Sequence, residues 1–144
     1  CDHGVYFTMT EQDVRNVMVN PLVMVGSDGG IALRGEFVHP RYCGTFPRVL
    51  GRYARDLKLF SMEEGVRRMT SLPASRLGLT RKGLLRPGMD ADMVLFDPGS
   101  IADGNDYEHP TEPPIGIESV WVAGRLAAHR GRLTDERAGR VLRF

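Results

Sequence analysis

The sequence predicts an α/β fold followed by a smaller β unit. Residues 10–18 have the spacing of an amphipathic helix, and residues 22–25 are an unbroken apolar run. A helix followed by a short buried strand is the repeating unit of α/β architecture. After about residue 83, Gly, Pro and Asp become frequent and the apolar runs shorten. We therefore expect two parts, residues 1–83 and residues 84–144.

The first part begins with residues 5–7, a short β-type run. Thr10 is a suitable N-cap for a helix with acidic residues in its first turn, and Pro21 ends that helix. The run 22–25 is expected to be a strand of a parallel sheet, buried on both faces. Its carboxyl end leads into Asp28, at the strand end where α/β barrels carry their chemistry.

The next stretch, residues 29–44, is predicted to be an irregular loop, and loops of this length tend to be functional or disordered. Helical periodicity resumes at Thr45. A capping-box pattern at Ser61 begins a further helix, and residues 73–77 are expected to form a short one.

The second part is expected to be a small β unit. Residues 97–114 are polar and read as a long surface excursion, and Ala123-Gly124 is a hairpin-turn signal. The expected strands are residues 93–96, 120–122, 125–128 and 141–142.

Composition and charge exclude several classes of protein. Hydrophobic residues make up 42% of the chain and charged residues 26%, as in soluble globular proteins. A net charge of +1 gives no reason to expect nucleic acid or an anionic membrane as a partner. No apolar stretch approaches the roughly 20 residues of a membrane span. Two cysteines, Cys1 and Cys43, are too few for a disulfide framework, so a reduced, cytoplasmic setting is expected.

Several stretches together resemble one family. They are VGSDG at residues 25–29, HPRY at 39–42, GTFPRVLGRY at 44–53, TSLPA at 70–74 and GLLRPGMDADMVLFD at 83–97. They are similar to the end of the amidohydrolase superfamily. Residues 39–53 resemble in particular its N-acyl-D-amino-acid deacylase (D-aminoacylase) branch.

The resemblance implies a metal-dependent (β/α)8 barrel with a small β-sandwich built from both ends of the chain. Residues 1–83 would then be the last part of the barrel, and residues 84–144 the C-terminal share of the sandwich. The family's paired histidines and its other metal ligands have no counterpart here. They would be supplied by an upstream part of the same polypeptide, and this stretch alone should be inactive.

The resemblance assigns catalysis and metal binding to Asp28. Zn²⁺ lowers the pKa of a bound water to about 7, and a neighbouring carboxylate can take that water's proton and deliver it to the leaving amine. Without the resemblance, Asp28 in the SDGG stretch would be a turn aspartate that bonds its own backbone.

Arg41 and His39 are the candidate substrate-binding residues. A D-amino acid presents a carboxylate, which Arg binds with two parallel hydrogen bonds. The alternative for Arg41 is a surface ion pair, and His39 either orients the substrate or caps the loop. Cys43 in the same loop is a metal thiolate or an incidental thiol.

The expected substrate is therefore a small N-acyl-D-amino acid. The nearest alternative is a cyclic amide, as in a hydantoinase- or dihydroorotase-like enzyme. A non-catalytic remnant or interaction module is the alternative from a different class. Three further histidines are scattered and are interpreted as surface residues: His3, His109 and His129.

Overall fold

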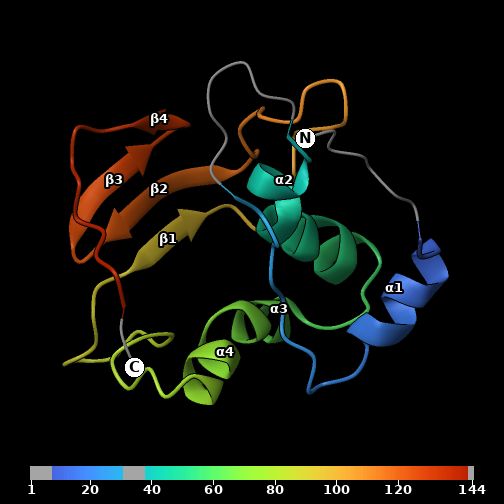
Figure 1. The fold of residues 1–144 in the computed structure, drawn as a ribbon, viewed down its shortest axis with the longest axis horizontal. Coiled ribbons are helices and arrows are strands. Elements are labelled where there is room, and N and C mark those ends of the chain that lie inside the picture. The colour runs from blue at the N-terminus through green and yellow to red at the C-terminus, as the bar shows by residue number, and fades with distance from the viewer. Residues whose placement is uncertain (1–7, 31–37, 143–144) are drawn as a thin grey trace.

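A computed structural model describes residues 8–30 and 38–142 of the chain (Figure 1). The helices occupy one side of the molecule and a small sheet the other, with α2 and the following π-helix near the centre. The elements are α1 (Glu11–Met18), α2 (Arg41–Arg48), the π-helix η1 (Val49–Asp56), α3 (Met62–Met69), α4 (Ser71–Arg76), β1 (Met93–Phe96), β2 (Ile117–Val122), β3 (Arg125–His129) and β4 (Arg132–Leu133). The expected run 5–7 lies outside the described residues.

Helix α1 begins and ends where its sequence signals predict. The Thr10 hydroxyl accepts a hydrogen bond from the Asp13 amide at 3.2 Å, and the Asp13 carboxylate accepts one from the Thr10 amide at 2.9 Å. This reciprocal capping satisfies donors that a helix start leaves open. The helix ends at Met18, before Pro21.

The prediction of a buried strand at residues 22–25 is wrong for this structure. The run forms no strand, and Leu22 is 81% exposed. Its Val25 amide donates to the Arg68 carbonyl at 3.1 Å rather than to a neighbouring strand. An apolar run becomes a parallel strand only when other strands offer hydrogen bonds along its length, and the described residues offer none.

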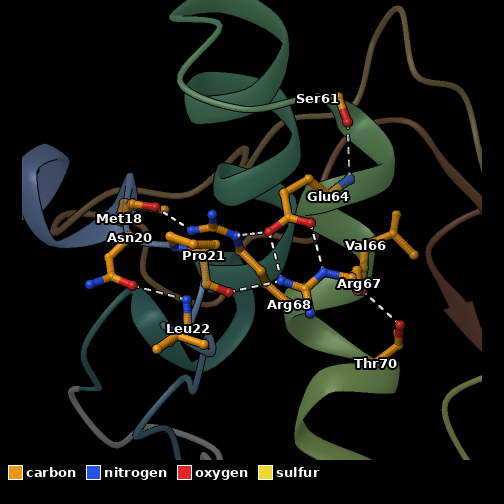
Figure 2. A network of polar contacts seen from close by, with 10 residues as sticks. All are labelled: Met18, Asn20, Pro21, Leu22, Ser61, Glu64, Val66, Arg67, Arg68 and Thr70. Atoms are coloured by element: carbon orange, nitrogen blue, oxygen red, sulfur yellow. Dashed lines mark hydrogen bonds and ion pairs between the residues drawn. The ribbon is translucent and has the colours of Figure 1, made fainter.

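An arginine pair on α3 holds this segment in place (Figure 2). Arg67 donates to the Pro21 carbonyl at 2.8 Å, and Arg68 donates to the Met18 carbonyl. Both guanidinium groups also bond Glu64, at 2.6 Å and 2.7 Å. These bonds, from Arg67 first and then Arg68, lower the pKa of Glu64 to about 2. The network fixes the path of the chain towards Asp28.

Helix α2 begins earlier than predicted. The sequence places a loop up to Gly44, whereas the helix starts at Arg41. Pro47 lies inside the helix, where it lacks the amide that would bond back along the helix. The helix continues as η1, which ends with an i to i+5 bond from the Leu57 amide to the Arg52 carbonyl at 2.9 Å.

The core lies where η1 meets the segment before β2. Apolar residues of η1 are buried, and Ile101 is 1% exposed. A Cβ at Gly51 would collide with the Ile101 carbonyl, so only glycine allows this approach. The Arg55 guanidinium donates to the same carbonyl at 2.8 Å. The buried residues of η1 are Val49, Leu50, Gly51, Tyr53 and Ala54.

The strands form an antiparallel sheet in the order β1-β2-β3-β4 within the described residues. Ala123 (φ 49°) and Gly124 (φ 78°) make the tight turn between β2 and β3, so the predicted hairpin is confirmed. The last predicted strand, 141–142, is wrong: these residues are irregular and Val141 is 83% exposed. Pairing with β3 is taken instead by β4, after the turn at Gly131. None of the helices among the described residues has the length and hydrophobicity of a transmembrane span.

Candidate functional site

Asp28 and Arg41, which lie apart in the sequence, meet as an ion pair. The distance from Arg41 Nη2 to Asp28 Oδ2 is 2.9 Å. The Asp28 side chain is 85% exposed and the Arg41 side chain 43%. Asp28 has a φ of 48°, a left-handed conformation that aspartate tolerates better than most residues. The pair is therefore accessible to a small molecule from solvent.

Two glycines after Asp28 bring its turn against α2. A Cβ at Gly29 would lie 3.0 Å from the Tyr42 Cα, and one at Gly30 would lie 3.1 Å from the Tyr42 hydroxyl. The Ser27 hydroxyl accepts a hydrogen bond from the Gly29 amide at 3.1 Å, so Ser27 acts as a turn residue. The close packing sets the Asp28 carboxylate beside the first residue of α2.

His39 holds the first amide of that helix. Its Nδ1 accepts a hydrogen bond from the Arg41 N–H at 3.0 Å. Burial, and secondly the charge of Arg41, lower the pKa of the His39 imidazole. The neutral ring that accepts at Nδ1 carries its proton on Nε2. Of the two functions considered for His39, the observed contacts are those of a cap.

A segment distant in sequence packs against this helix start, and sequence reasoning missed it. The Tyr107 ring meets the His39 ring edge-on, with centroids 5.3 Å apart. Asn105 Nδ2 donates to the Pro40 carbonyl at 2.7 Å. These residues belong to the polar stretch 97–114, whose composition gives no local signal of what it covers.

A separate cavity lies away from this cluster. A cavity of about 910 Å³ opens between the helices and β1, with a mainly apolar lining to which Cys43 contributes. Asp28, Arg41 and His39 do not line it. The candidate site is therefore an exposed cluster at the start of α2, separate from this cavity.

The remaining metal-ligand types are dispersed. His109 Nδ1 lies 3.4 Å from Asp106, and His129 Nδ1 lies 2.9 Å from the Ser119 hydroxyl. His3 lies outside the described residues. In residues 8–30 and 38–142, no three His, Cys, Asp or Glu side chains gather where they could hold a metal ion. These residues alone do not fit a zinc site, which needs at least three protein ligands.

The cluster nevertheless has two distinct chemical capacities. The Asp28 carboxylate can accept and return a proton. The Arg41 guanidinium has five N–H donors in a planar fork, so beside Asp28 it can also bind a second carboxylate.

Comparison with known proteins relates the chain to hydrolases. The model of the amidohydrolase family matches residues 10–128. The chain is 49% identical to a D-aminoacylase of Alcaligenes xylosoxydans xylosoxydans over 139 residues, which is 96% of this chain and 28% of that protein. It therefore spans little more than a quarter of that relative's length.

Two solved structures share its fold. A D-aminoacylase structure described with a binuclear metal centre aligns with a TM-score of 0.88 and 47% identity, covering 94% of this chain and 28% of its own. An N-acyl-D-glutamate deacylase from Bordetella bronchiseptica, complexed with zinc and a phosphonate mimic of the tetrahedral intermediate, aligns with a TM-score of 0.80 and 42% identity, covering 88% and 26%. With more than half of its residues matched by the family model, the chain belongs to the amidohydrolase family.

Proposed function

We propose that the whole protein hydrolyses the amide bond of N-acyl-D-amino acids, releasing a carboxylic acid and a D-amino acid. The observation that carries the proposal is the Asp28–Arg41 ion pair, in which a carboxylate that could carry a proton lies beside a guanidinium that could bind the carboxylate of a substrate. The identity with a D-aminoacylase over 96% of the chain supports the substrate class.

The proposed architecture follows the same relatives. Residues 1–83 would form the last part of a (β/α)8 barrel, and residues 84–144 the C-terminal share of a β-sandwich. The TM-score of 0.88 with D-aminoacylase supports this assignment. In a complete barrel, residues 22–25 would gain the neighbouring strands that they lack among the described residues.

Asp28 would serve as the proton carrier. Its carboxylate takes a proton from the attacking water and later gives it to the nitrogen of the leaving amine. Zn²⁺, when bound, would supply a water of lowered pKa, with Asp28 as one of its ligands. The remaining ligands would come from an upstream part of the same polypeptide, so we expect the present stretch alone to be inactive.

Arg41 would bind the α-carboxylate of the substrate. Binding through a carboxylate would fix the position of the scissile amide relative to Asp28. His39 would orient the substrate directly, or it would orient the Arg41 guanidinium through its hydrogen bond with the Arg41 amide.

The test is a substrate comparison with the whole protein. We expect turnover of N-acetyl-D-amino acids, a much lower kcat/KM for their L-enantiomers, and loss of activity on metal chelation that Zn²⁺ restores. Turnover of hydantoin or dihydroorotate without turnover of any N-acyl-D-amino acid would identify a cyclic amidase instead. Absence of all three activities in the metal-loaded protein would favour a non-catalytic function.

A further inference from the structure

We infer that Tyr107 is a positioning residue of the substrate-carboxylate site, acting on Arg41 through His39. The inference rests on the proposed function of Arg41. It adds to the site a segment that lies 68 residues beyond His39 in the chain. Its basis is a chain of three contacts, from Tyr107 to His39, from His39 to the Arg41 amide, and from Arg41 to Asp28.

The first step is the hydrogen bond between His39 and the Arg41 amide. The first amides of a helix have no partner within the helix and need an acceptor from outside. Pro40, at the N-cap position, has no side-chain acceptor to offer. His39 Nδ1 provides one for the Arg41 amide at 3.0 Å. A rotated imidazole would free this amide, and the residue that carries the guanidinium would lose its fixed position.

The second step is the contact between the Tyr107 ring and the His39 imidazole. The two rings meet at an interplanar angle of 79°, an edge-to-face geometry that aromatic rings favour. The Tyr107 hydroxyl lies 3.5 Å from His39 Nε2, the nitrogen that carries the proton when Nδ1 accepts. The lowered pKa of His39 favours the same neutral form. Tyr107 thus restrains the orientation of the ring.

The third step is the anchoring of Tyr107 itself. Asn105 donates to the Pro40 carbonyl at 2.7 Å and to the Pro110 carbonyl at 2.8 Å. Asp103 accepts from Arg48 at 2.7 Å, near the other end of α2. A Cβ at Gly44 would collide with the Asn105 side chain, so the two segments are in direct contact. The segment 103–110 is therefore fastened to both ends of α2, with Tyr107 directed at its start.

The experiment compares two substitutions in the whole protein. Tyr107→Leu removes the ring, and Tyr107→Phe keeps it without the hydroxyl. Glu108→Gln, an exposed neighbour in the same segment, is the matched control. Each variant is assayed on an N-acetyl-D-amino acid and on its primary carboxamide, which has no carboxylate for Arg41 to bind. Hydrogen–deuterium exchange of the peptide that contains residues 41–44 is measured in parallel.

We expect Tyr107→Leu to raise KM for the carboxylate substrate about 2- to 10-fold, with kcat little changed. This is the fold-change expected when the interaction of one aromatic pair is lost. KM for the carboxamide should not move, and Tyr107→Phe should keep most of the wild-type value. In an Arg41→Gln background, Tyr107→Leu should add nothing. Equal losses on both substrates, or full additivity with Arg41→Gln, would overturn the inference.

The exchange measurement separates this inference from the proposed function. Tyr107→Leu should speed exchange at residues 41–44 whether or not the protein turns over N-acyl-D-amino acids. Unchanged exchange in Tyr107→Leu rejects the positioning function of Tyr107. Faster exchange without any deacylase activity would instead reject the proposed substrate class and keep the structural link.

Discussion

The Asp28–Arg41 pair is built for contact with solvent rather than for stability. Both side chains are substantially exposed, and exposed ion pairs stabilise proteins by about 0–1 kcal/mol. Asp28 also has a positive φ, which folding alone does not favour. A residue that contributes little to folding and holds an unusual backbone conformation is typical of a functional position.

Glu64 makes the opposite contribution, because its charge supports the fold. Hydrogen bonds from Arg67 and Arg68 lower its pKa to about 2, below its ordinary value of 4.5. A carboxyl whose pKa is lowered by folding stabilises the protein above the unfolded value. That stabilisation is lost as the pH falls from about 4.5 towards 2.

We therefore predict that Glu64→Gln lowers the free energy of unfolding at pH 7 and flattens its dependence on pH below 4.5. Urea unfolding of the whole protein at several pH values between 7 and 2.5 measures both effects. Glu112→Gln, at an exposed loop position, is the control. An acid dependence as steep in Glu64→Gln as in the wild type would contradict the assigned function of the arginine network.

The helix starts and the hairpin turn that depend on contacts within a few residues were predicted correctly from the sequence. Thr10 and Ser61 each cap the helix that follows, and Ala123-Gly124 makes the hairpin turn. In each case the decisive hydrogen bond or backbone angle lies within a few residues of the signal. These elements could therefore be derived from the sequence.

Elements that depend on distant partners were predicted wrongly. The run 22–25 has the composition of a buried strand, yet a strand needs neighbouring strands. Its Val25 amide instead donates a hydrogen bond to the Arg68 carbonyl on α3. The start of α2 was missed because its cap is an imidazole, His39, rather than one of the usual N-cap side chains. The last apolar pair, 141–142, pairs with no strand among the described residues.

The same distinction applies to the candidate site. Asp28, His39 and Arg41 came from a resemblance of motifs, and the structure brings them together. Their catalytic and binding functions remain predictions. Tyr107 and Asn105 were missed because more than 60 residues separate them from the residues they contact.

The turn between β2 and β3 contains a residue whose replacement should stabilise the protein. Ala123 adopts a φ of 49°, which costs an L-residue roughly 1–2 kcal/mol, and asparagine tolerates this region better. Ala123→Asn should raise the free energy of unfolding by up to about 1 kcal/mol. The hydrogen bond from the backbone amide of residue 123 to the Asp92 carboxylate should be unaffected. Denaturant unfolding measures the change. Ala128→Asn, within β3, should destabilise instead, because asparagine is unfavourable in strands.

At the scale of the whole molecule, the described residues leave much apolar surface uncovered. Both Val94 and Leu95 of β1 are 53% exposed although they point to opposite faces of the sheet. Leu22 and Leu85 are 81% and 76% exposed. The proposed barrel and sandwich would cover these side chains, since relatives of this chain are more than three times its length.

The proposed proton transfer by Asp28 can be tested by the kinetics of Asp28→Asn in the whole, metal-loaded protein. Asparagine keeps the size of the side chain but cannot carry the proton, so kcat for an N-acetyl-D-amino acid should fall about 10²- to 10⁴-fold. A kcat within a few-fold of the wild type, in a protein that retains its metal, would contradict the account.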